Sequence, residues 1–171
     1  MRHSKVASSK VYRYLSDPRF KKEFDLDYKI NHSSDVPYVA GYSIDGRTVF
    51  VDRHFKKMMG KIDVEPYIFV HEKCEKALID VFGLKYQEAH SIATHLERMT
   101  IERDGIAWDK YEKFVMKQYK HIGHEKIQKI PHNLDLTPYK DERDIHVLRQ
   151  MQNDSKHNNK TSGTKRSLKD L

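Results

Sequence analysis

Residues Tyr67–Phe82 read YIFVHEKCEKALIDVF, and this stretch decides the predicted fold. Its apolar residues recur every three or four positions, which predicts a helix with one apolar face. Asp63 can cap the start of this helix, and Gly83 follows its end. We therefore expect one long helix here, against which neighbouring segments pack.

A helical wheel places two polar side chains on the face of this helix that should meet the core. His71 and Glu75 are four residues apart, so they project from the same side, between Ile68 and Leu78. Burying such groups is costly unless they are paired or bind a metal. Glu72 lies at the border of this face, closer to solvent. The opposite, solvated arc holds Lys73, Lys76 and Asp80.

Upstream, residues 37–52 read PYVAGYSIDGRTVFVD and predict a β-hairpin. Two β-rich runs flank Asp45-Gly46, and glycine tolerates the positive φ of a tight hairpin turn. We expect strands at about 38–43 and 47–52. Because a single hairpin is marginally stable in water, it should pack against the helical part of the chain.

Downstream, the apolar spacing predicts further helices. They span about Tyr86–Arg103, Trp108–Ile122 and Pro138–Gln152, with a short segment at His124–Lys129 between the last two. Near the N-terminus, the VYRYL segment predicts a small helix that Pro18 limits. The expected fold class is therefore α+β and mostly helical, with a β-hairpin packed against a helix bundle and flexible basic ends.

The net charge of +7 resides at the two ends of the chain. Residues 1–29 hold 8 Lys/Arg and 4 Asp/Glu, residues 153–171 hold 5 and 2, and residues 30–152 hold 19 of each. We therefore expect a basic N-terminal segment, a single globular domain over 30–152 without a basic face, and a disordered basic tail. The ends are either solubilising or make weak, salt-dependent contact with nucleic acid.

Three absences narrow the class of protein. No apolar run approaches the roughly 18 residues of a membrane helix, and the first residues, MRHSKVASSKVYRYL, lack the apolar core of a secretory signal. The one cysteine, Cys74, cannot form an internal disulfide and is most simply a small buried hydrophobe. We expect a soluble, cytoplasmic protein with no membrane partner, and the sequence predicts no oligomeric state.

The second long helix brings a third candidate ligand. His90 lies 19 residues after His71, and helices joined by a short connection at Gly83 pack antiparallel, so His90 can face His71 and Glu75. Two His and one Glu can form a zinc site with an open fourth position. Glu72 could then take a proton from a bound water whose pKa the metal lowers. The alternative is a hydrogen-bonded buried pair of His71 and Glu75 that fixes helix packing.

This pattern resembles the zincin metallopeptidases, in which a helix carries His-Glu-x-x-His and a third ligand follows downstream. In this chain Glu75 stands where the family has its second His, a departure that leaves the ligand assignment open. The resemblance implies Glu72 as general base and a strand edge beside the helix that aligns an extended peptide. A peptide or protein substrate is then expected.

The stretch from about Pro37 to Met151 is also similar to an uncharacterised family of small phage and prophage proteins. The similarity rests on V-F-V-D-R at 49–53, H-E-x-x-E-K-A-L-I-D at 71–80, Y-x-x-A-H-x-x-A-T at 86–94 and L-D-L-x-P-Y at 134–139. It implies a metallopeptidase-like site and a viral origin, and it brings no known activity.

Two more residues are candidates for roles near such a site. Glu97 shares the helical stripe of His90, where it would orient His90, replace a ligand or, most simply, be a surface charge. Tyr139 could donate a hydrogen bond to a developing oxyanion, although packing of the last helix is the simpler interpretation.

The leading hypothesis is thus a zinc-dependent hydrolase of the peptidase type. Zinc would be held by His71, Glu75 and His90, with Glu72 and Tyr139 as catalytic residues. Its rival is a non-enzymatic phage accessory protein that binds a host protein or nucleic acid and uses the His/Glu cluster structurally. A third hypothesis keeps the metal as a structural staple between two helices.

Overall fold

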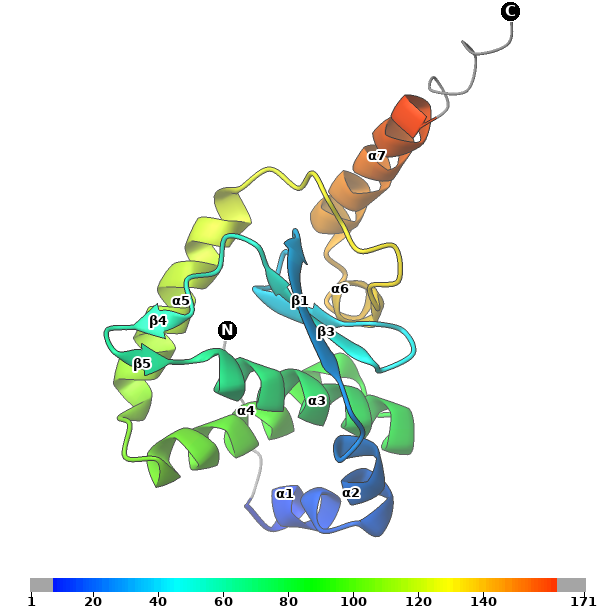
Figure 1. The fold of residues 1–171 in the computed structure, drawn as a ribbon. Coiled ribbons are helices and arrows are strands. Elements are labelled where there is room, and N and C mark those ends of the chain that lie inside the picture. Colours follow the sequence, from blue (N-terminus) through cyan, green and yellow to red (C-terminus); the bar gives the residue numbers. More distant parts are fainter. Residues whose placement is uncertain (1–7, 163–171) are drawn as a thin grey trace, which may run out of the picture.

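The computed structural model describes residues 8–162 and, for the side chains, residues 8–153. Its helices are α1 (Ser8–Leu15), α2 (Pro18–Phe24), α3 (Glu65–Phe82), α4 (Tyr86–Arg103), α5 (Trp108–His124), α6 (Thr137–Asp141) and α7 (Ile145–Ser162). Its strands are β1 (Lys29–Ser34), β2 (Ala40–Tyr42), β3 (Thr48–Asp52), β4 (Met58–Met59) and β5 (Ile62–Asp63). The protein is α+β and mostly helical, which confirms the expected class (Figure 1). None of these helices is both long and apolar enough to cross a membrane.

Helices α3 and α4 form the centre of the fold and run side by side in opposite directions (Figure 1). The Asp63 carboxylate accepts a hydrogen bond from the Glu65 N–H (3.0 Å), but Asp63 is not the capping residue that the sequence predicts, because Val64 is the N-cap residue of α3 and no side chain caps the helix. Gly83 ends α3 in the left-handed conformation (φ +64°), and its N–H donates to the Ile79 carbonyl. Because only residues 83–85 separate the two helices, α4 returns antiparallel along α3.

The expected hairpin is present. β2 and β3 pair antiparallel, with Ala40 opposite Val51 and Tyr42 opposite Val49. Gly46 lies in its turn at φ +62°, as the Asp-Gly signal predicts. β1 adds parallel to the other edge of β3, so the strand order is β1-β3-β2. The sequence does not predict β1, because KINHSS is polar and lacks an alternating apolar pattern.

The outer edge of β2 is partly covered by residues 133–135. The Ile44 N–H donates to the Asn133 carbonyl, and the Asp135 N–H donates to the Tyr42 carbonyl, both at 2.9 Å. The preceding residues, 38–41, line a cavity instead. Residues 40–41 of this uncovered edge belong to β2, which packs beside α3.

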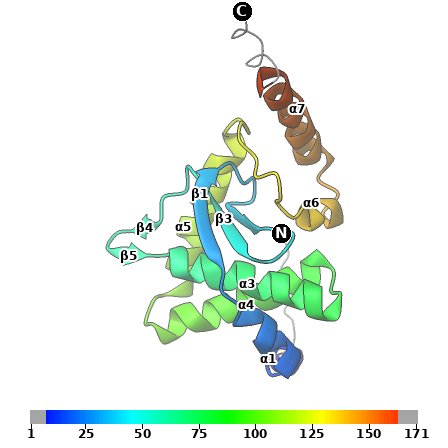
Figure 2. The ribbon, with the colours of Figure 1, turned by 45° about the vertical axis from the view of Figure 1, so that its right-hand side comes forward.

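Helices α1 and α2 pack on the side of α3 and α4 opposite the sheet (Figures 1 and 2). Val11 and Phe20 are buried there in one apolar cluster with Cys74, which is fully buried as expected. The flexible basic segment expected over residues 1–29 is therefore wrong for α1 and α2, and residues 1–7 lie outside the described residues. The apolar side chains of α1 and α2 hold this segment against α3 despite its charge.

The C-terminal part differs from the expectation in two ways. The single helix expected at Pro138–Gln152 is two helices, because Arg143 turns the chain with a left-handed backbone (φ +55°) between α6 and α7. α7 then projects from the body and continues to Ser162 (Figure 2). The disordered tail expected from residue 153 is therefore wrong as far as 162, and residues 163–171 lie outside the described part of the chain.

Candidate metal centre

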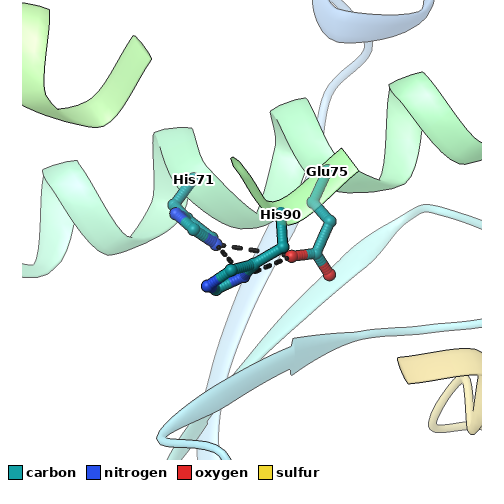
Figure 3. Close-up of side chains that lie close together, drawn as sticks. All are labelled: His71, Glu75 and His90. Atoms are coloured by element: carbon teal, nitrogen blue, oxygen red, sulfur yellow. Dashed lines mark hydrogen bonds and ion pairs between the residues drawn. The ribbon is translucent and has the colours of Figure 1, made fainter. Parts of the chain in front are cut away.

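Three potential ligand atoms converge between α3 and α4 (Figure 3). His71 and Glu75 lie one turn apart on α3, and His90 lies near the start of α4. The Nδ1 atom of His90 is 3.0 Å from Glu75 Oε2 and 3.1 Å from His71 Nε2. His71 Nε2 is 3.4 Å from Glu75 Oε2. Ligand atoms at about 2.0–2.1 Å from a tetrahedral zinc ion lie about 3.3 Å apart, so these separations suit one ion.

His71 and Glu75 are each hydrogen-bonded on the side that faces away from the candidate metal position. These bonds direct the other ligand atom of each residue toward that position. His71 Nδ1 lies 2.9 Å from Glu97 Oε2, so Glu97 holds the proton of Nδ1, and Nε2 is the atom that a metal would bind after its own proton leaves. Tyr42 donates its hydroxyl proton to Glu75 Oε1 (2.8 Å), which leaves Oε2 beside His90. Metal-binding imidazoles and carboxylates are usually oriented by a second layer of partners in this way.

Glu97 is buried and joins the site to α5. Its Oε1 atom accepts a hydrogen bond from the Tyr111 hydroxyl. The simplest expectation, that Glu97 is a surface charge, is therefore wrong, and the histidine that it orients is His71 rather than His90. No local sequence signal indicates Tyr42 or Tyr111 as part of the site, because their hydrogen bonds join segments that only the tertiary fold brings together.

The buried hydrogen bonds of the cluster set the charges of Glu75 and His71. Burial alone would raise the pKa of Glu75, but its hydrogen bonds with His71 and His90 outweigh burial and lower that pKa to about 2. Glu75 is therefore anionic at neutral pH, the form that coordinates a metal. Burial disfavours the charged form of His71, yet the adjacent carboxylates, Glu97 first, raise its pKa well above the ordinary value. The same carboxylates therefore hold a proton on His71, and a metal ion at its Nε2 atom would have to displace that proton.

Glu72 is buried beside the ligands, which corrects its expected position near solvent. Burial, and then the negative charge of Glu75, raise the pKa of Glu72 to about 8. Within residues 8–153, its carboxylate has no hydrogen-bond or ion-pair partner, and it lines the cavity at the site. A carboxylate with a pKa near neutrality and a free face can both accept and return a proton.

A cavity of about 540 Å³ opens onto the ligands. Its polar lining holds carboxylates and both histidines, and it contains no Lys or Arg from the described residues. A cavity of this size with a few convergent polar groups is typical of a ligand or substrate site. Its apolar wall is largely aromatic and includes Tyr38, Trp108, Val115, Tyr119 and Tyr139.

Tyr139 lies in the wall of this cavity, with its ring 4.5 Å from that of Tyr38. Burial raises the pKa of its hydroxyl far above the ordinary value, so the group stays protonated. Tyr139 therefore packs against its neighbours, as the simpler interpretation has it. Its role as a hydrogen-bond donor to a reacting oxygen stays a prediction.

A second group of potential ligands, Asp35, Asp52 and His54, lies near the end of β3. The carboxylate oxygens of Asp35 and Asp52 already accept hydrogen bonds from other parts of the protein. Asp52 accepts a hydrogen bond from the Val36 N–H, and Asp35 accepts two from backbone N–H groups after α5 and one from Arg53. We interpret this group as a clamp that ties loops together, not as a metal site.

Comparisons of the chain with protein-family models, with curated proteins and with solved structures give no match. The resemblances to zincins and to phage proteins therefore stay predictions. The case for a function rests on the chemistry of the site itself.

Proposed function

We propose that this protein is a zinc-dependent hydrolase that cleaves a peptide or protein substrate. His71, Glu75 and His90 hold the metal, and Glu72 is the general base. The observation that carries this proposal is the convergence of three ligand atoms within 3.4 Å of one another beside a cavity. Three protein ligands leave one position open, which is the arrangement of catalytic rather than structural zinc sites.

The residues around the ligands have the properties that hydrolysis needs. Zinc in this site would supply a Lewis acid that acidifies a bound water. Glu72, whose pKa is raised to about 8, would in its ionised form accept a proton from water and return it to the leaving amine. Tyr139 donates a hydrogen bond to the oxygen that becomes negative in the transition state. The aromatic wall keeps bulk water away from the reacting bond.

The uncovered edge of β2 favours an extended substrate. In an antiparallel pair, successive residues bond alternately toward and away from the partner strand. The Val39 carbonyl accepts from the Asp52 N–H and the Ser43 N–H donates to the Thr48 carbonyl, so both residues bond toward β3. The N–H and C=O groups of Ala40 therefore point away from β3, at the cavity. A peptide can add to such an edge as a further strand.

Two rival hypotheses use the same residues differently. A structural metal staple needs no cavity at its ligands and no free carboxylate at Glu72. A non-enzymatic phage accessory protein, binding a host protein or nucleic acid, needs no metal. The cavity and the buried, unpartnered Glu72 favour the hydrolase, because perturbed carboxylates in clefts concentrate at catalytic sites.

The first experiment measures metal in the purified, untagged protein by elemental analysis, beside a His71→Ala/Glu75→Ala variant. We expect about one zinc per chain, lost in the variant. If neither protein holds metal, even after incubation with zinc, the hydrolase and the staple are both excluded. His71 and Glu75 would then be a structural buried pair.

A second experiment separates catalysis from metal binding. Glu72→Gln should keep its zinc and lose at least about 100-fold in peptide cleavage, because the general base is removed. Cleavage is measured by mass spectrometry on a mixture of peptides blocked at both ends. Glu112→Gln removes another carboxylate of the cavity wall and is the matched control, which should stay active. Full activity of Glu72→Gln would exclude its role as the base.

A further inference from the structure

One face of α5 carries a row of basic side chains, which we call the lysine row. Its members follow one another at steps of three, four, three and four residues, so they share one side of the helix. Every member is exposed, whereas Tyr111 and Ile122 on the opposite side are buried. The lysine row consists of Lys110, Lys113, Lys117, Lys120 and His124.

The lysine row lacks acidic partners, which only some of the surface cations of this protein have. Among residues 8–153, no carboxylate forms an ion pair or hydrogen bond with any of its five members. Elsewhere on the surface, Lys10 pairs with Glu88, and Arg98 pairs with Glu102 one turn away. Like charges three or four residues apart destabilise a helix, so such a row is unfavourable unless a ligand compensates it.

The acidic residues of the folded part are unevenly distributed, which explains why sequence counting misses this face. Residues 30–152 hold equal numbers of acidic and basic residues. However, Glu72, Glu75 and Glu97 are buried at the site, and Glu112 of α5 lines the cavity. Apart from Asp109 in its first turn, the exposed ionisable side chains of α5 are basic, so the outer surface of this helix is basic. The expectation of a folded part without a basic face is therefore wrong.

We infer that the lysine row binds the phosphate backbone of nucleic acid. At about 1.5 Å per residue, Lys110 to His124 spans about 21 Å along a straight helix, enough to follow several successive phosphates. Among the described residues of α5, Met116 is the one large apolar side chain that is exposed, whereas a helix that lies on a membrane surface inserts a whole apolar face. Binding of this kind is independent of base sequence and strongly salt-dependent.

The experiment measures fluorescence anisotropy of labelled duplex DNA with the full-length protein at several salt concentrations. Four phosphate contacts predict a slope of log affinity against log salt of about −3.6. The variant Lys113→Gln/Lys117→Gln/Lys120→Gln should reduce that slope to about −1, because about one contact remains. Its melting temperature should be no lower than that of the unmodified protein, since removing like-charge neighbours relieves repulsion.

The matched control is Lys21→Gln/Lys22→Gln/Lys29→Gln, which removes the same charge from exposed positions on α2 and β1. It should bind DNA with the slope of the unmodified protein. An equal loss in both variants would place the contact in the N-terminal segment or in net charge and overturn the inference. Failure to bind DNA at low salt, or binding only to vesicles of anionic lipid, would overturn it too. The result is independent of the hydrolase proposal, because metal-free, inactive protein keeps the row.

Discussion

Tyr111 holds the buried Glu97 carboxylate, which lies behind His71 at the candidate metal centre, in place. Its hydroxyl donates to Glu97 Oε1, and Glu97 in turn accepts from His71 Nδ1. Tyr111→Phe would leave the aromatic ring but remove the donor, so Glu97 would lose a bond and His71 a fixed orientation. We expect zinc affinity to fall about 10–100-fold, the usual effect of removing such an outer partner.

The measurement for Tyr111→Phe is competition with a zinc chelator of known affinity. Tyr67→Phe is a suitable control, since the Tyr67 hydroxyl donates to Asp104, away from the ligands. The control should keep the zinc affinity of the unmodified protein. Unchanged affinity in Tyr111→Phe would show that Glu97 positions His71 without help from α5.

Single residues also show where reasoning from the sequence reaches its limit. The pairing of His71, Glu75 and His90 follows from helical spacing and a short connection, and the structure brings all three together. Lys76 was expected on a solvated arc, yet it is buried and pairs with Asp80 and Asp135. A helical wheel assumes that one side of a helix is exposed to solvent, whereas α3 is covered by the sheet, by α4 and by α2.

At the level of elements, strong local signals predicted the parts of the fold correctly. The Asp45-Gly46 turn, the apolar spacing of α3 and the stop at Gly83 are each decided by a few neighbouring residues. β1 has no such signal, because its stability comes from pairing with β3 rather than from its own sequence. The break between α6 and α7 at Arg143 likewise has no signal in the sequence, since arginine has no preference for the left-handed backbone that it adopts there.

The hairpin turn offers a test of how backbone and packing contribute to its stability. Gly46 and Gly60 both have positive φ, at +62° and +64°. A Cβ on Gly46 would lie 3.3 Å from the Tyr28 hydroxyl, whereas one on Gly60 would meet nothing within 4 Å. We expect Gly60→Ala to lower the free energy of unfolding by about 1 kcal/mol through backbone strain alone. Gly46→Ala should cost more than that, because Tyr28 must also move.

Urea unfolding of the two glycine variants measures the difference directly. Equal losses would mean that Tyr28 moves aside freely and that only the backbone matters. A smaller loss for Gly46→Ala than for Gly60→Ala would contradict the packing of Tyr28 over this turn.

At the scale of the whole molecule, an ion pair links α3 to residues 133–135, the segment that covers part of the edge of β2. Lys76 Nζ lies 2.9 Å from Asp135 Oδ2. Burial opposes ionisation of Asp135, but hydrogen bonds from Lys76 and from the Thr137 N–H outweigh it and lower the pKa of Asp135. A lowered pKa in the folded state adds stability above about pH 4, the ordinary value, and this stability is lost as the pH falls through the lowered pKa.

Lys76→Met removes one side of this link and should lower the free energy of unfolding at pH 7 by about 2 kcal/mol, since solvent reaches part of the pair. The difference from the unmodified protein should begin to shrink as the pH falls below about 4 and should vanish below the lowered pKa of Asp135, where this carboxyl is protonated in both proteins. Unfolding in urea at several pH values measures this. Lys61→Met, at an exposed position, should show neither effect. A difference independent of pH would assign the effect of Lys76 to packing of its alkyl chain.

The burial of Cys74 has a practical consequence for following the motions of this protein. Cys74 is the only cysteine of the chain and lies fully buried in the cluster that α1 and α2 cover. A thiol reagent can reach it when these helices separate from α3, or when α3 and α4 separate in more extensive unfolding. The labelling rate of the native protein therefore counts such openings, and its comparison with global unfolding distinguishes local detachment from complete unfolding. The labelling rate of Cys74 thus reports how often the layer formed by α1 and α2 opens.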